Sequence, residues 1–296
     1  MTVSPLPLPA EHPVFHRTVT VRGLEIFYRE AGAPTRPTVL LLHGFPTSSH
    51  MFRNLIPGLA ADFHVIAPDY PGFGQSSAPG ADEFAYTFDH LTDVLESFLV
   101  QLGVTRFALF MQDYGAPVGF RLATRHPDWV RGLIVQNANA YVDGLGAAFE
   151  PLKPFWAQRT PETELPVRTL LTPASTRFLF LQGARRPEVI SPDTWVHAQA
   201  GLDRPGNDRI QLALLHDFRN NPPRYAEWHA YFRRHQPPTL IAWGRHDPVF
   251  AEAGARAFLR DLPAAALHLF ETGHFALEED GAAIADLARA FLRRLP

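Results

Sequence analysis

Three ionisable residues, Asp113, Asp247 and His274, each stand at or just beyond the end of a short apolar run of the sequence. Such runs are typical of buried strands in a parallel sheet. Because ligands of open α/β sheets bind beyond the carboxyl ends of the strands, we expect the three side chains to meet at one edge of the sheet. A nucleophile, an acid and a histidine in this chain order could carry out nucleophilic catalysis, with the acid orienting the imidazole.

The sharpest signal is Asp113, in the window from Phe110 to Gly115 (FMQDYG). In the nucleophile elbow pattern G-x-S-x-G, a strand turns abruptly into a helix and lifts the central side chain clear of the sheet. Gly115 matches the second glycine of that pattern, but Met111 replaces the first. The alternative is that Asp113 only caps the helix that follows it.

The segment HGFP at 43–46 follows another apolar run. In this position the backbone N–H of Phe45 could form one half of an oxyanion hole, and the N–H of Tyr114, next to the candidate nucleophile, the other half. The alternative is a plain loop with a turn-forming proline.

An aspartate nucleophile predicts a particular reaction. Its reference pKa of about 3.9 leaves it ionised near neutrality, so it needs no base before it attacks. It could displace a leaving group from saturated carbon, which would leave an alkyl ester on Asp113. His274, oriented by Asp247, would then activate water to hydrolyse that ester. The predicted substrate is an alkyl halide or an epoxide.

The elements that must position these residues alternate between strand and helix patterns, which predicts a mostly parallel sheet with helices on both faces. The predicted strands are 18–23, 24–30, 38–44, 63–69, 106–113, 132–138, 239–244 and 266–270, and the first two form an antiparallel hairpin at Gly23. Helical periodicity is clearest at 88–102, 115–126, 252–262 and 282–294.

Between Ala140 and about Arg233 this alternation stops, prolines become frequent, and the apolar spacing turns helical. We therefore predict a core domain of residues 1–139 and 234–296, with a helical insertion at 140–233 between the sixth and seventh strands.

Composition excludes several classes of function. A hydrophobic share of 46% and a charged share of 19% indicate a globular protein, and a net charge of -3 without a basic stripe argues against nucleic-acid or anionic-membrane partners. With no cysteine, thiolate chemistry is excluded, and the scattered histidines predict no metal and no cofactor. The first residues do not follow the pattern of a signal peptide, and no run of 18 apolar residues occurs, so we expect a cytoplasmic protein.

Together these residues resemble the haloalkane dehalogenase and epoxide hydrolase branch of the α/β-hydrolases over nearly the whole chain. The likeness rests on five motifs: HGFP (43–46), APDYPGFGQS (67–76), QDYG (112–115), GRHDPVF (244–250) and TGHF (272–275). It implies an α/β-hydrolase fold with an eight-stranded sheet, an Asp-His-Asp catalytic triad, and a cap domain formed by 140–233. The glycines of 67–76 are expected to serve backbone geometry rather than chemistry.

The resemblance does not settle the leaving group. Dehalogenases hold the halide with an indole after the nucleophile and a second donor, whereas this chain has Tyr114 and Phe45 in those places and could use Trp156 of the cap. Epoxide hydrolases protonate the ring with cap tyrosines, whereas the matching segment here begins with Phe218. Tyr141, Tyr225 or Tyr231 could replace it. We favour the dehalogenase-like reaction, with epoxide hydrolysis as the alternative. The pocket residues we expect are His43, Pro46, Tyr114, Tyr141, Trp156 and Phe218.

Two other classes remain. An ester or lactone hydrolase normally needs serine at the elbow, and Ser48 and Ser49 are poorly placed for that role. A non-catalytic binding protein could keep the same fold, although the intact acid and histidine argue against it. The expected partners are a small hydrophobic substrate and water, and the expected assembly is a monomer or homodimer.

Overall fold

A computed structural model describes residues 12–296 of the chain. The N-terminal segment on which the expected absence of a signal peptide rests lies almost entirely outside the described residues. The strands are β1 (Phe15–Val21), β2 (Leu24–Ala31), β3 (Thr38–Leu42), β4 (His64–Pro68), β5 (Phe107–Gln112), β6 (Val130–Gln136), β7 (Thr239–Gly244) and β8 (Ala266–Phe270). All eight predicted strands are therefore confirmed, with small differences at their ends.

The strands form one sheet in the order β1-β2-β4-β3-β5-β6-β7-β8. β2 runs antiparallel to both of its neighbours, and every pair from β4 to β8 is parallel. The predicted hairpin of β1 and β2 is confirmed, with Val21 opposite Leu24. Since β3 to β8 are parallel, their carboxyl ends lie along one edge of the sheet.

The helices are α1 (Leu55–Ala60), α2 (Phe88–Gln101), α3 (Gly115–Arg125), α4 (Leu152–Ala157), α5 (Pro161–Arg168), α6 (Pro173–Leu181), α7 (Pro192–Leu202), α8 (Asn207–Asp217), α9 (Tyr225–His235), α10 (Glu252–Ala257) and α11 (Ala276–Leu292). Sequence periodicity missed the short α1, and it placed the start of α11 six residues too late. α1 has only six residues, too few for a helical period to stand out, and the start of α11 carries three acidic residues, Glu278, Glu279 and Asp280, that weaken its apolar pattern.

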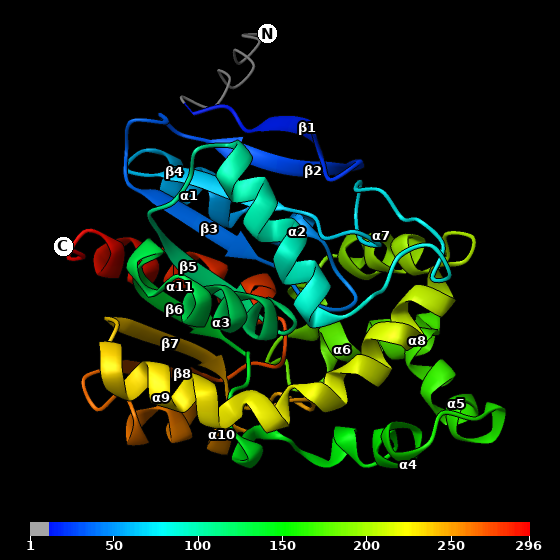
Figure 1. The fold of residues 1–296 in the computed structure, drawn as a ribbon. Helices are drawn as coiled ribbons and strands as arrows, with labels where there is room; N and C mark the ends of the chain where they lie inside the picture. The colour runs from blue at the N-terminus through cyan, green and yellow to red at the C-terminus, as the bar shows by residue number, and fades with distance from the viewer. Residues whose placement is uncertain (1–11) are drawn as a thin grey trace, which may run out of the picture.

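Helices cover both faces of the sheet (Figure 1). Apolar residues of α1 and α11 pack on one face, and those of α2, α3, α9 and α10 pack on the other. Alternate residues of β5 point to opposite faces of the sheet. Leu109 and Met111 pack with α2, α3, α9 and α10, whereas Ala108 and Phe110 pack with α1 and α11. This alternation follows from the period of two along a strand.

Helices α4 to α9 all lie between β6 and β7. In Figure 1, α4, α5, α6 and α8 extend away from the sheet, beyond the carboxyl ends of its central strands. α9 differs from them, because Trp228 and Phe232 pack against Phe120 of α3, with ring centroids 5.3 and 5.2 Å apart. The last helix of the segment 140–233 is thus anchored on the sheet-covering layer.

Candidate active site

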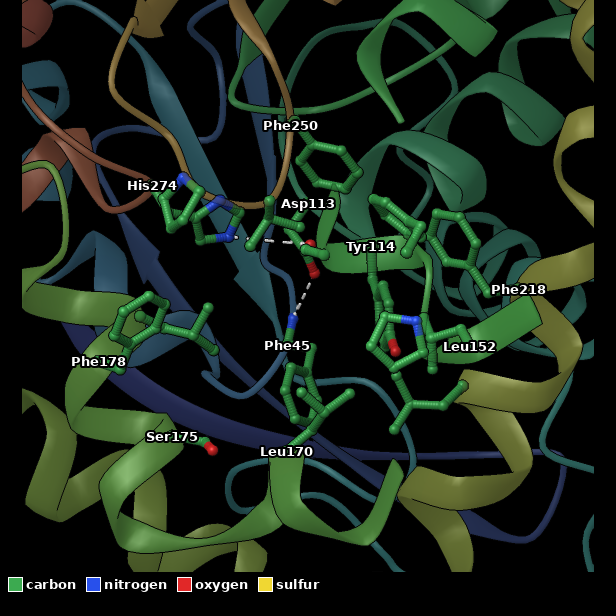
Figure 2. A pocket seen from close by; sticks show the side chains of 17 residues that line it. Phe45, Asp113, Tyr114, Leu152, Leu170, Ser175, Phe178, Phe218, Phe250 and His274 are labelled. Atoms are coloured by element: carbon green, nitrogen blue, oxygen red, sulfur yellow. Dashed lines mark hydrogen bonds and ion pairs between the residues drawn. The ribbon is translucent and has the colours of Figure 1, made fainter. Parts of the chain in front are cut away.

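Asp113 lies in the turn between β5 and α3, as the elbow pattern predicts. Its φ of 50° is in the left-handed region, which few residues other than glycine adopt, although aspartate and asparagine tolerate it best. A strained backbone of this kind persists only where surrounding structure holds it, and it is common at functional sites. The turn points the carboxylate of Asp113 into a cavity (Figure 2).

Two backbone N–H groups hold this carboxylate. That of Phe45 donates to Oδ1 of Asp113 over 2.7 Å, and that of Tyr114 also donates to the carboxylate. The loop after β3 comes so close that a Cβ atom at Gly44 would overlap the side chain of Asp113. The two amides predicted for an oxyanion hole therefore converge on one group.

His274 lies in the loop between β8 and α11, on the side of Asp113 opposite the Phe45 amide (Figure 2). Its Nδ1 lies 2.9 Å from Oδ2 of Asp247, and its Nε2 lies 3.8 Å from Oδ2 of Asp113. All three side chains are buried. The three residues singled out from the sequence thus meet at one edge of the sheet, in the order carboxylate, imidazole, carboxylate.

Sequence reasoning missed the role of Asn137, the residue after β6. Its side-chain amide donates to Oδ2 of Asp247 over 2.8 Å and to the carbonyl of Gly244 over 3.2 Å, while its Oδ1 accepts from the N–H of Gly244. Oδ1 of Asp247 accepts from the N–H of Val249. Asp247 is therefore locked in the orientation that serves His274. The only sequence signal for Asn137 is an asparagine at a strand end, which is common in turns.

Burial dominates the electrostatics of Asp113. It raises the pKa of this carboxyl to about 6, although the charge of His274 and the two backbone N–H groups oppose the rise. Burial alone would lower the pKa of His274, but the charge and hydrogen bond of Asp247, together with the charge of Asp113, raise it above its ordinary value. At neutral pH the site therefore favours an ionised Asp113.

The cavity in front of Asp113 has a volume of about 320 Å³ and is largely apolar. The core supplies Phe45, Asp113, Tyr114, Pro248, Val249, Phe250 and His274. The segment between β6 and β7 supplies Ala148, Phe149, Pro151, Leu152, Leu170, Ser175, Phe178, Leu179, Leu215 and Phe218. Figure 2 shows these side chains around the carboxylate. The lining suits a small hydrophobic ligand.

Residues 37–281 match the family model of the alpha/beta hydrolase fold. The chain belongs to the α/β-hydrolase family. This hydrolase is 41% identical over 277 residues to an uncharacterised hydrolase of Saccharomyces cerevisiae, with 92% of the chain and 94% of the relative covered. It is 30% identical over 264 residues to haloalkane dehalogenase 1 of Mycobacterium bovis, with 84% of the chain and 82% of the relative covered.

Among solved structures, the haloalkane dehalogenase DbeA from Bradyrhizobium elkani is similar with a TM-score of 0.76 at 27% identity, covering 96% of this chain and 98% of the other. These relatives lie in the dehalogenase branch of the family. The predicted fold class, the predicted family branch and the prediction of a hydrolytic enzyme are confirmed.

The hydrolase departs from the sequence predictions in four of the expected pocket residues. Phe45, Tyr114 and Phe218 line the cavity, but His43, Pro46, Tyr141 and Trp156 are not among the lining residues of the described chain. Three of these side chains, His43, Tyr141 and Trp156, make hydrogen bonds elsewhere that their residue types did not reveal.

Hydrogen bonds explain three of these differences. The indole N–H of Trp156 donates to the carbonyl of Leu215 over 2.8 Å, and the hydroxyl of Tyr141 donates to Asp261 over 2.8 Å. His43 is buried, and its Nε2 accepts the N–H of Tyr70 over 3.3 Å. Pro46 is part of the same tight loop as His43.

The serines considered for the rival esterase reaction hold local structure instead. Oγ of Ser48 accepts the N–H of His50, and Oγ of Ser49 accepts from Nε of Arg29. Neither serine lines the cavity within residues 12–296.

Apart from Phe218, the apolar lining residues of the segment between β6 and β7 went unrecognised in the sequence. Among them, Phe149, Leu152 and Leu215 are buried, and their helical spacing is the same as that of ordinary core residues. Only their position opposite Asp113 distinguishes them.

Over residues 12–296, no group of three or more His, Asp or Glu side chains could hold a metal ion, and no helix is long and apolar enough to cross a membrane.

Proposed function

We propose that this hydrolase cleaves small, neutral, hydrophobic compounds that carry a leaving group on saturated carbon, through a covalent ester of Asp113. The observation that carries this proposal is the carboxylate of Asp113 at the bottom of an apolar cavity, with Oδ1 on the Phe45 N–H and Oδ2 beside His274. A surface residue that merely capped a helix would need neither the cavity nor the imidazole.

In the first step, an oxygen of Asp113 forms a bond to the substrate carbon, and the leaving group departs with the electron pair. Oδ1 is held by the Phe45 N–H at 2.7 Å, so Oδ2 is the oxygen we assign to the attack. No base is required, because the carboxylate is already ionised at neutral pH. The apolar wall excludes water that would solvate and weaken the nucleophile.

In the second step, Nε2 of His274 takes a proton from water, and the oxygen of that water attacks Cγ of the Asp113 ester. The negative charge that develops on Oδ1 is stabilised by the N–H groups of Phe45 and Tyr114. The bond from Oδ2 to the acyl carbon then breaks, and the departing alcohol takes a proton from His274. Asp247 orients the imidazole and balances its charge.

A halide is the leaving group we favour, on the strength of the dehalogenase relatives and of the hydroxyl of Tyr114, a residue that lines the cavity. Burial raises the pKa of Tyr114 well above its ordinary value, so its hydroxyl remains protonated, and that hydroxyl finds no acceptor among residues 12–296. We therefore assign this hydroxyl as the donor to a departing halide. Trp156 is set aside, because its N–H is already bound to Leu215.

Epoxide hydrolysis remains the alternative, because the same phenol can give a proton to an opening ring. Tyr141 and Tyr225 make other hydrogen bonds, with Asp261 and Asn139 respectively. Tyr231, like those two, is not among the residues that line the cavity within residues 12–296, so Tyr114 is the tyrosine we assign to either reaction.

We assign the role of cap to α4 through α8 in particular, because α9 packs on α3. The expected cytoplasmic location and the monomeric or dimeric state stay predictions.

The decisive experiment traps the ester. In His274→Gln the first step should proceed and the second should stop, so incubation with 1-bromobutane should add a butyl group to the Asp113 peptide, as measured by mass spectrometry. The double variant Asp113→Ala/His274→Gln should gain no such mass. If no adduct forms with any alkyl halide or epoxide tested, the proposed function is wrong.

A second experiment separates the two leaving groups. Halide release from 1-bromobutane and diol formation from 1,2-epoxybutane are measured in parallel in the wild type and in Tyr114→Phe. We expect halide release in the wild type and a fall of about tenfold or more in the variant, because a hydrogen bond to a charged group is lost. Diol formation without halide release would favour the epoxide alternative.

A further inference from the structure

Gln112, the last residue of β5, contacts His274 from a side that the mechanism above does not use. Its side chain is fully buried, and its Nε2 lies 2.9 Å from Nε2 of His274. This is shorter than the 3.8 Å from the same imidazole nitrogen to Oδ2 of Asp113. Nε2 of His274, the nitrogen that accepts a proton from water in the proposed mechanism, is thus in contact with the amide of Gln112.

Gln112 approaches from behind the site. Along β5, Phe110 belongs to the apolar group that packs with α1 and α11. Gln112 is two residues further along the strand, so its side chain lies on the same face of the sheet as that of Phe110. Gln112 is absent from the residues that line the cavity, whereas Asp113 and His274 are present. It therefore contacts the imidazole and not the substrate.

The hydrogen bond depends on the protonation state of the imidazole. With Nδ1–H donating to Asp247, a neutral His274 has a lone pair at Nε2, which can accept an N–H of the Gln112 amide. Once Nε2 carries a proton, it needs an acceptor instead. Oε1 of Gln112 is buried and has no hydrogen-bond partner among residues 12–296. Rotation of the side-chain amide by about 180° would place Oε1 next to Nε2 of His274 in place of the NH₂ group.

We propose that Gln112 is a positioning residue for the imidazole of His274: its amide donates to the lone pair of Nε2 in the neutral ring until the hydrolytic water displaces it, and its Oε1 accepts from Nε2 once that nitrogen carries a proton. The inference rests on the proposed function, because it assigns Gln112 to the second, hydrolytic step. The first step, in which the imidazole takes no proton, does not need it.

The charged groups that face His274 are few. Asp247 and Asp113 lie on either side of the ring. On α11, Glu278 is paired with Arg53, and Glu279 with Arg185 and Arg186. The amide of Gln112 is thus an uncharged partner among carboxylates, able to follow the proton without adding charge.

The chain offers a matched control in Gln136, which lies opposite Gln112 in the register of β5 and β6. Gln136 is equally buried, and both polar atoms of its amide lack partners in the described part of the chain, but it has no hydrogen bond to His274. Replacing it tests the loss of a buried amide without loss of the imidazole contact.

The test compares Gln112→Met and Gln136→Met with the wild type, all labelled with ¹⁵N-histidine, the His274 signals being assigned by their loss in His274→Gln. We expect the Nε2 resonance of neutral His274 to move in Gln112→Met and to stay in place in Gln136→Met, because only the first loses a donor to that nitrogen. Gln112→Asn, whose amide is one methylene too short, should behave like Gln112→Met and serves if the latter does not fold.

Single-turnover reactions with 1-bromobutane then measure formation and decay of the Asp113 adduct. We expect decay to slow by about tenfold or more in Gln112→Met while formation changes by less than about threefold. Unchanged Nε2 resonances in both Gln112 variants would overturn the inference even if no adduct forms at all. Adduct formation with equal decay in the wild type and Gln112→Met would also overturn it, while leaving the proposed function intact.

Discussion

At the scale of single residues, Asp113 experiences two opposing environments. Burial in an apolar cavity disfavours its charge, while two backbone N–H groups and the imidazole of His274 favour it. The balance leaves a carboxylate that is ionised near neutrality but poorly solvated, which is a useful condition for a nucleophile. Reference pKa values alone predicted the ionisation but not the extent of burial.

The pH dependence follows from this balance. In the proposed mechanism attack requires ionised Asp113, and burial raises the pKa of that group to about 6, so kcat/KM should fall as the pH drops through about 6. The hydrolytic step needs neutral His274, whose pKa is raised by Asp247, so this step also weakens as the pH falls. Initial rates with 1-bromobutane between pH 4.5 and 9 measure the profile. A plateau that extends to pH 4.5 would contradict it.

At the scale of elements, the loop after β3 and the turn after β5 must fit closely together. Gly44 allows the loop to reach the side chain of Asp113, because a Cβ there would overlap the carboxylate. Glycine is required at this point for close approach rather than for a positive φ. The Phe45 N–H reaches Oδ1 of Asp113 only if this fit is kept.

We therefore expect Gly44→Ala to lower kcat/KM by about a hundredfold or more, because removing an oxyanion-hole donor has effects of this size. The matched control is Gly201→Ala in α7, where an added Cβ meets open space. Its activity should stay within about twofold of the wild type, as for surface substitutions in general. Circular dichroism checks folding of both variants, and an active Gly44→Ala would contradict the assigned role of the loop.

At the scale of the whole molecule, the cavity exists only because two parts of the chain face each other. The sheet edge contributes Asp113 and His274, and the segment between β6 and β7 contributes most of the apolar wall. Under the proposed function, the segment between β6 and β7 would control substrate size, and the core would carry out the chemistry. This division explains how related enzymes with the same fold can act on different compounds.

Leu152→Trp, on α4, should fill part of the cavity. We expect kcat/KM for 1-bromohexane to fall by about tenfold more than that for 1-bromoethane, since a few carbon atoms in an apolar pocket change binding by this order. The control is Leu165→Trp on α5, whose side chain is 68% exposed. Equal losses for both substrates in Leu152→Trp, or the same preference in Leu165→Trp, would argue against this assignment of the wall.

Taken by itself, the sequence determined the eight strands, the hairpin, the place of the helical segment and the three residues Asp113, Asp247 and His274. These follow from local patterns, since apolar runs, turn residues and chain order are written along the chain. The missed start of α11 shows the limit, because helix ends depend on packing and capping as much as on periodicity.

Only the tertiary structure decided which cap residues face Asp113, that Trp156 donates to Leu215, and that Asn137 and Gln112 support Asp247 and His274. The physical reason is that a buried polar group takes whichever partner the packed chain brings within about 3 Å. That partner is often more than a hundred residues away, as Asn137 is from Asp247, and no local pattern reveals it.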